Sequence, residues 1–118
     1  MTLIEVVAVL CIIESNGNPN AIGDRHLGED CARGILQIRP CVITDVNRKY
    51  KTAYRVEDCF DAEKSKDICI KYLTMYCGKN ASFETYVRTW NGGPTGAKRQ
   101  TTLAYWHKCQ KILSRRIV

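Results

Sequence analysis

The apolar residues of this chain recur mostly with the spacing of α-helices. Residues 3–13 are apolar except at Glu5, which predicts a helix that is buried on most sides and ends near Glu14. Residues 16–31 are rich in Gly, Asn, Asp and Pro and predict a loop or a short hairpin. A short apolar run follows at residues 35–38. We therefore expect the first third of the chain to be a buried helix followed by a turn-rich segment.

Later helices are predicted from the residues that begin and end them. Proline, serine, threonine and aspartate favour helix starts, and glycine favours helix ends. The predicted helices run from Pro40 to about Tyr50, from the N-cap Asp61 to Gly78, from the N-cap Ser82 to Asn91-Gly92-Gly93-Pro94, and from Thr101 or Thr102 to Leu113. Residues 51–60 show no clear period and are predicted to be irregular.

The chain shows no repeat, low-complexity tract or internal linker. At 118 residues it is expected to form one domain over residues 1–118, able to bury about two thirds of its unfolded surface. The predicted fold class is mainly α, with at most a small β-hairpin near residues 20–38. A hydrophobic content of 45% with 25% charged residues is ordinary for a globular protein, and no apolar run reaches the ~18 residues of a membrane span.

Seven cysteines are many for a chain of this length. No pair has the C-x-x-C spacing and no histidine lies near one in a zinc-like pattern, so we expect no metal site. Cys11 and Cys69 fall on apolar helix faces and are expected to be small buried hydrophobes. Two alternatives stay open: mostly reduced cysteines, or one to three disulfides. The odd count leaves at least one free thiol in a monomer.

Glu14 is the main candidate for chemistry. It lies where the apolar helix ends and the turn-rich segment begins. Its carboxyl group is therefore expected beside apolar surface, at the edge of a mobile loop. Low polarity disfavours the ionised form, and such a glutamate can stay protonated near neutral pH and act as a general acid. The alternative is that Glu14 merely ends an amphipathic helix.

Three motifs follow one another in a telling order: Glu14-Ser15, then Gly34–Ile38, then Trp90–Pro94. The ordered set resembles the lysozyme-like superfamily of glycosidases over about residues 5–112. The first two motifs look like those of goose-type lysozymes and soluble lytic transglycosylases. The last third, from Tyr86 to Gly96 with Thr102, Tyr105-Trp106 and Lys108, looks more like invertebrate-type (destabilase) lysozymes.

The resemblance implies an α+β lysozyme-like fold and a muramidase, a glycosidase that cleaves peptidoglycan at β-1,4 MurNAc–GlcNAc bonds with Glu14 as general acid. For a second carboxylate the candidates are Asp24, Glu29 and Asp30. Asp24 is preferred because it follows Glu14 by ten residues, close to the spacing in invertebrate-type lysozymes. It could instead be a turn aspartate that bonds its own backbone. Lytic transglycosylases need no second carboxylate, because a hydroxyl of the sugar itself attacks.

The resemblance implies that the remaining candidate residues bind substrate, and four of them have a structural alternative. Polar and aromatic side chains beside a cleft suit N-acetylated sugars. The expected substrate-binding residues are Ser15, Gln37, Trp90, Asn91, Gly92 and Tyr105. The alternatives are a helix-terminal hydroxyl for Ser15, local loop pinning for Gln37, core packing for Trp90 and turn geometry for Gly92. His26 and His107 are expected to be surface residues.

The net charge of +6 suits an anionic partner. We expect peptidoglycan or a related N-acetylated glycan as partner. We expect no nucleic acid, because clustered arginines with exposed aromatics are not evident. Neither a metal nor another cofactor is expected, and the protein is expected to be a monomer. Two alternatives remain: a lytic transglycosylase that forms anhydro-muramyl products, and a non-catalytic glycan-binding module of lysozyme fold.

The place of action is expected to be the cell wall, reached by export or release. This would make the protein secreted or periplasmic, or part of phage-type lysis. Residues 3–13 do not look like a signal peptide, because no Lys or Arg precedes them and no small-residue cleavage site follows. We therefore count that stretch as the first core helix.

Overall fold

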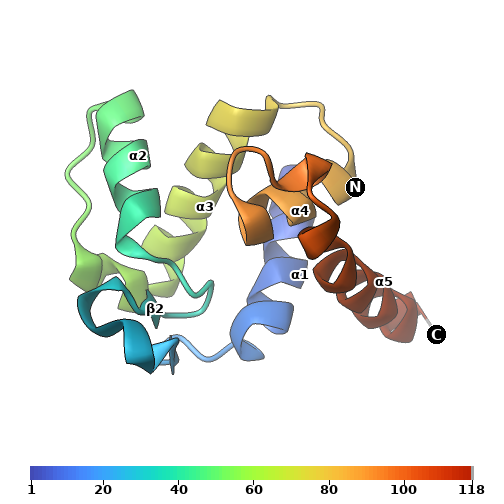
Figure 1. Ribbon diagram of the computed structural model, residues 1–118, viewed down its shortest axis with the longest axis horizontal. Coiled ribbons are helices and arrows are strands. Elements are labelled where there is room, and N and C mark those ends of the chain that lie inside the picture. The colour runs from blue at the N-terminus through green and yellow to red at the C-terminus, as the bar shows by residue number, and fades with distance from the viewer. Residues whose placement is uncertain (118) are drawn as a thin grey trace.

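The computed structural model describes residues 1–117, with side chains up to Arg115. Helices predominate, and a two-stranded sheet lies between the first two of them in the chain (Figure 1). The elements are α1 (Leu3–Ser15), β1 (Ile22–Gly23), the 3₁₀ helix η1 (Arg25–Asp30), β2 (Ala32–Arg33), α2 (Pro40–Tyr50), η2 (Val56–Phe60), α3 (Ala62–Cys77), α4 (Phe83–Gly92), η3 (Gly96–Lys98), η4 (Gln100–Thr102) and α5 (Leu103–Ile117). The predicted fold class is confirmed.

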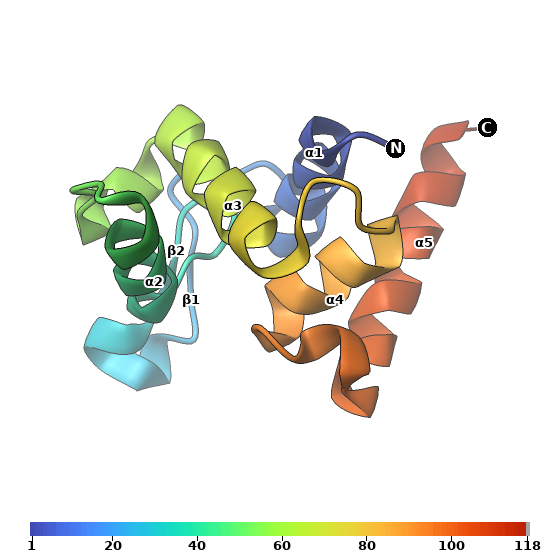
Figure 2. The ribbon, with the colours of Figure 1, turned by 90° about the horizontal axis from the view of Figure 1, so that it is seen from above.

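The helices form two groups that meet along α3. Helix α2 packs on one side of α3, while α1, α4 and α5 pack against one another on the other side (Figure 2). Helix α1 contacts α3, α4 and α5, and α4 contacts α1, α3 and α5. The end of α1 and the end of α4 therefore belong to the same group of packed helices.

Helix α1 begins at a capping box. The Thr2 hydroxyl accepts a hydrogen bond from the Glu5 amide, and the Glu5 carboxylate accepts one from the Thr2 amide. Val6 and Leu10 are fully buried in the core. Asn16 ends the helix in the left-handed conformation, with φ 54°. The predicted end near Glu14 is confirmed, because Glu14 lies in the last turn.

The predicted hairpin is confirmed as a very short one. Ile22 pairs with Arg33 and Gly23 with Ala32 in antiparallel register, and a single bridge joins Arg33 to Ile38. Between the two strands lies η1, with Asp24 before it and Cys31 after it. The hairpin leads directly into α2, whose first residue is Pro40.

Most predicted helix boundaries agree with the structure. Asp61 and Ser82 cap α3 and α4 by accepting hydrogen bonds from the Lys64 and Thr85 amides. Two predictions were wrong. Residues 56–60 are not irregular but form η2, where the Asp58 carboxylate accepts a hydrogen bond from the Arg55 amide at 2.8 Å. The last helix extends past Leu113, since no glycine or proline follows to stop it.

The seven cysteines all lie in the described part of the chain, and each is a free thiol there. Cys11, Cys69 and Cys109 belong to the hydrophobic core, so the expectation that Cys11 and Cys69 are buried is confirmed. No helix within the described residues is long and apolar enough to cross a membrane.

Candidate active site

Glu14 reaches across the helix group to Tyr105. The Tyr105 hydroxyl donates a 2.6 Å hydrogen bond to the Glu14 Oε2 atom, linking α1 to α5. Among the described residues, this is the one hydrogen bond made to the Glu14 carboxyl group. The second carboxyl oxygen therefore has no partner in that part of the protein and is available to a ligand.

The surroundings of Glu14 favour its neutral form. Burial raises the pKa of Glu14 to about 7. The hydrogen bond from Tyr105 and the positive charges of Lys108 and Arg39 lower this pKa, while the charge of Asp24 raises it. Burial also raises the pKa of the Tyr105 hydroxyl far above its ordinary value, so that this group stays protonated and can only donate to an ionised Glu14.

Three buried cysteine thiols lie near the Glu14 carboxyl group. Burial raises the pKa of Cys11, Cys69 and Cys109, and the charge of Glu14 raises each of them further. Neutral thiols behave as small apolar groups. They add to the low polarity that holds a proton on Glu14.

A cavity of about 470 Å³ opens beside Glu14. The lining residues come from the end of α1, the hairpin, the start of α2, α3 and the end of α4. They are Glu14, Gly23, Asp24, Ala32, Gln37, Arg39, Cys41, Val42, Tyr72, Trp90, Asn91 and Gly93. The structure thus gathers five of the predicted site residues, Glu14, Asp24, Gln37, Trp90 and Asn91, around one cavity.

Asp24 faces this cavity as part of an ion pair. It lies between β1 and η1 in the left-handed conformation (φ 53°), and its Oδ2 atom accepts a 2.5 Å hydrogen bond from Nη2 of Arg39. Its side chain makes no capping bond to the following turn, so the alternative of an aspartate that bonds its own backbone is contradicted. The other candidates, Glu29 and Asp30, are exposed in η1 and do not line the cavity.

Gln37 both lines the cavity and pins the hairpin. Its amide nitrogen donates to the carbonyl oxygens of Ala21 at 3.2 Å and Gly34 at 3.0 Å. Its amide oxygen lies so close to Gly23 that a Cβ atom there would be 2.1 Å away. The loop-pinning role of Gln37 is therefore observed, and its bonds hold the hairpin in which Asp24 directly follows β1.

Trp90 and Asn91 lie in the last turn of α4. The Trp90 ring packs edge-on against Tyr72 of α3, with ring centroids 5.6 Å apart and planes at 85°. Trp90 is partly buried, whereas Asn91 is exposed. Trp90 therefore fills core on one side and borders the cavity on the other, so both of its predicted roles are compatible with its position.

Ser15, Gly92 and Tyr105 do not line the cavity. The Ser15 hydroxyl donates to the Ile35 carbonyl oxygen at 2.7 Å, which ties the end of α1 to the loop before α2. A Cβ atom on Gly92 would lie 2.5 Å from the Thr102 methyl group, so glycine is needed there for close packing. Tyr105 acts on Glu14. These three residues do not face the cavity and instead position the elements and the carboxyl group that do.

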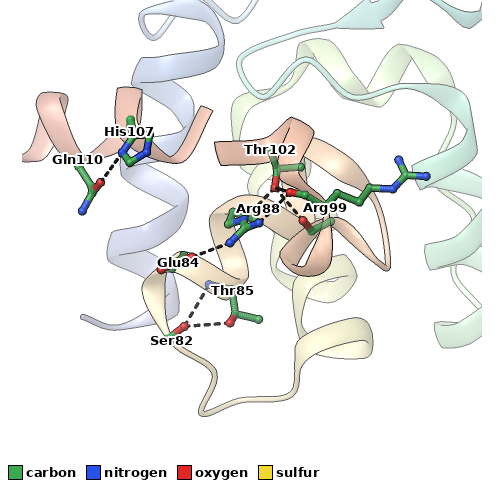
Figure 3. A network of polar contacts seen from close by, with 9 residues as sticks. Ser82, Glu84, Thr85, Arg88, Arg99, Thr102, His107 and Gln110 are labelled. Carbon is green, nitrogen blue, oxygen red and sulfur yellow. Dashed lines mark hydrogen bonds and ion pairs between the residues drawn. The ribbon is translucent and has the colours of Figure 1, made fainter. Parts of the chain in front are cut away.

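A polar network joins α4 to the segment that leads into α5 (Figure 3). The Arg88 guanidinium donates to Glu84 at 2.7 Å, to the Thr102 hydroxyl at 2.8 Å and to the Arg99 carbonyl at 2.7 Å. Thr102 is buried and precedes α5 directly. The network thereby fixes the position of Tyr105 on α5 relative to Trp90 on α4.

Seven of the lining residues were not predicted as site residues, and Arg39 and Tyr72 are the two of them with large polar side chains. Arg39 precedes Pro40, which confines it to extended backbone (φ −95°, ψ 155°) and makes it the N-cap of α2. Tyr72 was recognised only as part of a helix. The proline after Arg39 could have indicated its extended backbone. No neighbouring residue in the sequence indicates that the Arg39 side chain pairs with Asp24. Within residues 1–117 no group of three or more His, Cys, Asp or Glu could hold a metal ion.

Comparison with known proteins defines the class. The family model of the transglycosylase SLT domain matches residues 2–113. A lysozyme of Ostrea edulis is 32% identical over 102 residues, which cover 83% of this chain and 72% of that protein. The chain belongs to the transglycosylase SLT domain family, and the predicted membership of the lysozyme-like superfamily is confirmed.

Solved structures agree with this assignment. The crystal structure of Tapes japonica lysozyme has a TM-score of 0.75 at 26% identity, covering 92% of this chain and 88% of that one. A chain in the crystal structure of Aeromonas hydrophila PliI in complex with Meretrix lusoria lysozyme has a TM-score of 0.77 at 23% identity, with coverage of 91% and 87%. The latter likeness shows the fold alone.

The Tyr105 hydrogen bond has a measurable effect on Glu14. Tyr105→Phe removes a donor that favours the ionised carboxylate, so the pKa of Glu14 should rise by about one unit above that of the parent. Carbon NMR of labelled glutamate, titrated from pH 4 to 10, measures this shift. Tyr54→Phe removes a phenol that bonds Asp67 outside the cavity and serves as control. An unchanged or lowered pKa in Tyr105→Phe would contradict the account.

Proposed function

We propose that the protein is a muramidase that hydrolyses the β-1,4 bonds between MurNAc and GlcNAc in peptidoglycan. The observation that carries the proposal is the Glu14 carboxyl group, which is held neutral at the wall of a cavity whose other wall presents the Asp24–Arg39 ion pair. A protonated carboxyl group and a carboxylate that line the same cavity are the pair that most glycoside hydrolases use.

In the proposed reaction Glu14 donates its proton to the glycosidic oxygen as the bond to the anomeric carbon breaks. The Asp24 carboxylate stabilises the positive charge that develops at this carbon, where water completes the hydrolysis. Tyr105 orients the acid, because its hydrogen bond fixes one carboxyl oxygen. Since catalysis needs protonated Glu14, activity should fall as pH rises through about 7.

Substrate binding is proposed for the residues that reach the cavity. Trp90 offers an aromatic edge to a sugar ring, and Asn91 offers an exposed amide to hydroxyl or N-acetyl groups. Gln37 holds the hairpin and presents its amide oxygen at the same wall. We further propose that the enzyme is one domain, acts as a monomer, and meets peptidoglycan after export or release.

A lytic transglycosylase is the second candidate, favoured by the name of the matching family model. In that reaction the proton transfer from Glu14 is the same, but a hydroxyl of the sugar displaces the leaving group. The product is then an anhydro-muramyl end rather than a reducing end. The role of Asp24 separates the two reactions, since only the hydrolase uses its carboxylate directly.

Glu14→Gln should remove activity while keeping the fold. The amide has the same shape but cannot donate the required proton, so clearing of a cell-wall suspension should slow by about 10²–10⁴-fold. Glu29→Gln changes an exposed carboxylate of η1 outside the cavity and should retain the parental rate. A folded Glu14→Gln protein that keeps more than about a tenth of the parental rate would rule out Glu14 as the acid.

Asp24→Asn tests the mechanism. If the carboxylate stabilises the developing charge, the rate should fall at least about a hundredfold, while Asp30→Asn should behave like the parent. Mass spectrometry of the fragments identifies the reaction, with reducing ends expected from the parent. Near-parental activity of Asp24→Asn together with anhydro-muramyl products would replace the hydrolase by a lytic transglycosylase.

A further inference from the structure

Arg39 is the one basic side chain among the residues that line the cavity. The carboxyl groups at its wall are Glu14, which burial favours in its neutral form, and Asp24, whose negative charge would repel an anionic ligand if Arg39 were absent. The Asp24–Arg39 pair cancels this negative charge. The cavity is therefore electrostatically open to ligands that carry a carboxylate.

The guanidinium of Arg39 has donors to spare. It carries five N–H groups, and within the described residues a single hydrogen bond, from Nη2 to Asp24, uses them. The side chain is 48% exposed, so its remaining edge is accessible at the cavity mouth. Asp24 holds the group in place, and the planar fork of arginine suits a carboxylate.

The base of this side chain is rigid. Arg39 is fixed in extended backbone by Pro40 and forms the N-cap of α2. Cys41 and Val42, in the first turn of the same helix, also line the cavity. The positive end of the helix dipole thus adds to the positive charge of Arg39. An anion bound at this wall meets an oriented cation rather than a mobile surface chain.

We propose that Arg39 is a specificity-determining residue, which binds a carboxylate carried by the glycan and makes the enzyme prefer carboxylate-bearing sugars over neutral N-acetylated ones. This inference rests on the proposed function and deepens it. A muramyl sugar carries a lactyl carboxylate when no peptide is attached, whereas GlcNAc carries none. Arg39 would donate hydrogen bonds to the lactyl carboxylate of the muramyl sugar while it keeps its bond to Asp24.

The experiment compares two glycans of the same length and linkage that differ at the lactyl group, which is charged in one and neutral in the other. One is a GlcNAc–MurNAc tetrasaccharide with free lactyl carboxylates, and the other is the same tetrasaccharide with these groups converted to amides. For the parent, kcat/KM should be about tenfold higher on the free carboxylate form, mostly through a lower KM. Arg39→Gln should bring this ratio to about one, and Arg39→Lys should keep an intermediate ratio because it retains charge without the fork.

Arg48→Gln is the matched control. Arg48 lies on the same helix, pairs with Asp45 and does not line the cavity, so its loss changes net charge equally but should leave the ratio at the parental value. If Arg39 serves Asp24 alone, Arg39→Gln and Arg39→Lys lose rate equally on both glycans and the ratio persists, which overturns the proposal. If the parent protein cleaves both glycans with the same kcat/KM, the proposal is overturned before any variant is tested. Failure of the parent to cleave either glycan would instead count against the proposed function.

Discussion

The hydrogen bond between Tyr105 and Glu14 joins the first helix to the last. The two residues are 91 positions apart in the chain. It forms where burial already opposes charge on the carboxyl group. Burial and this bond act in opposite directions on the pKa of Glu14, and burial prevails. The result is an oriented carboxyl group that keeps its proton close to neutral pH. The rest of the site is arranged around this group.

Two sets of contacts keep the geometry. On one side, Gln37 joins Ala21 to Gly34 across the hairpin, and Ser15 ties the end of α1 to the loop before α2. On the other side, Arg88 of α4 bonds Arg99 and Thr102, in the segment that leads into α5. The cavity therefore depends in part on Ser15 and Arg88, which do not line it, a common property of sites that must hold groups within fractions of an ångström.

Local signals made much of the fold predictable. The helix starts at Pro40, Asp61 and Ser82 could be predicted from the sequence. Each of these residues acts on backbone groups only a few positions away. The order of motifs also led to the prediction that Glu14 is the acid, and the structure places Glu14 at the cavity wall. Contacts between distant segments were not predictable in this way. Nothing near Ser15 shows that its hydroxyl meets Ile35, and nothing near Arg39 shows that its charge meets Asp24.

The central claim is that the proton which burial keeps on Glu14 is the proton used in catalysis. The most direct measurement is the pH dependence of kcat/KM on a soluble peptidoglycan fragment, set beside the NMR titration of Glu14 in the same protein. The account predicts that the rate declines on the alkaline side with an apparent pKa of about 7 and that Glu14 titrates at the same pH. A rate that stays constant well above the pH at which Glu14 loses its proton would contradict it.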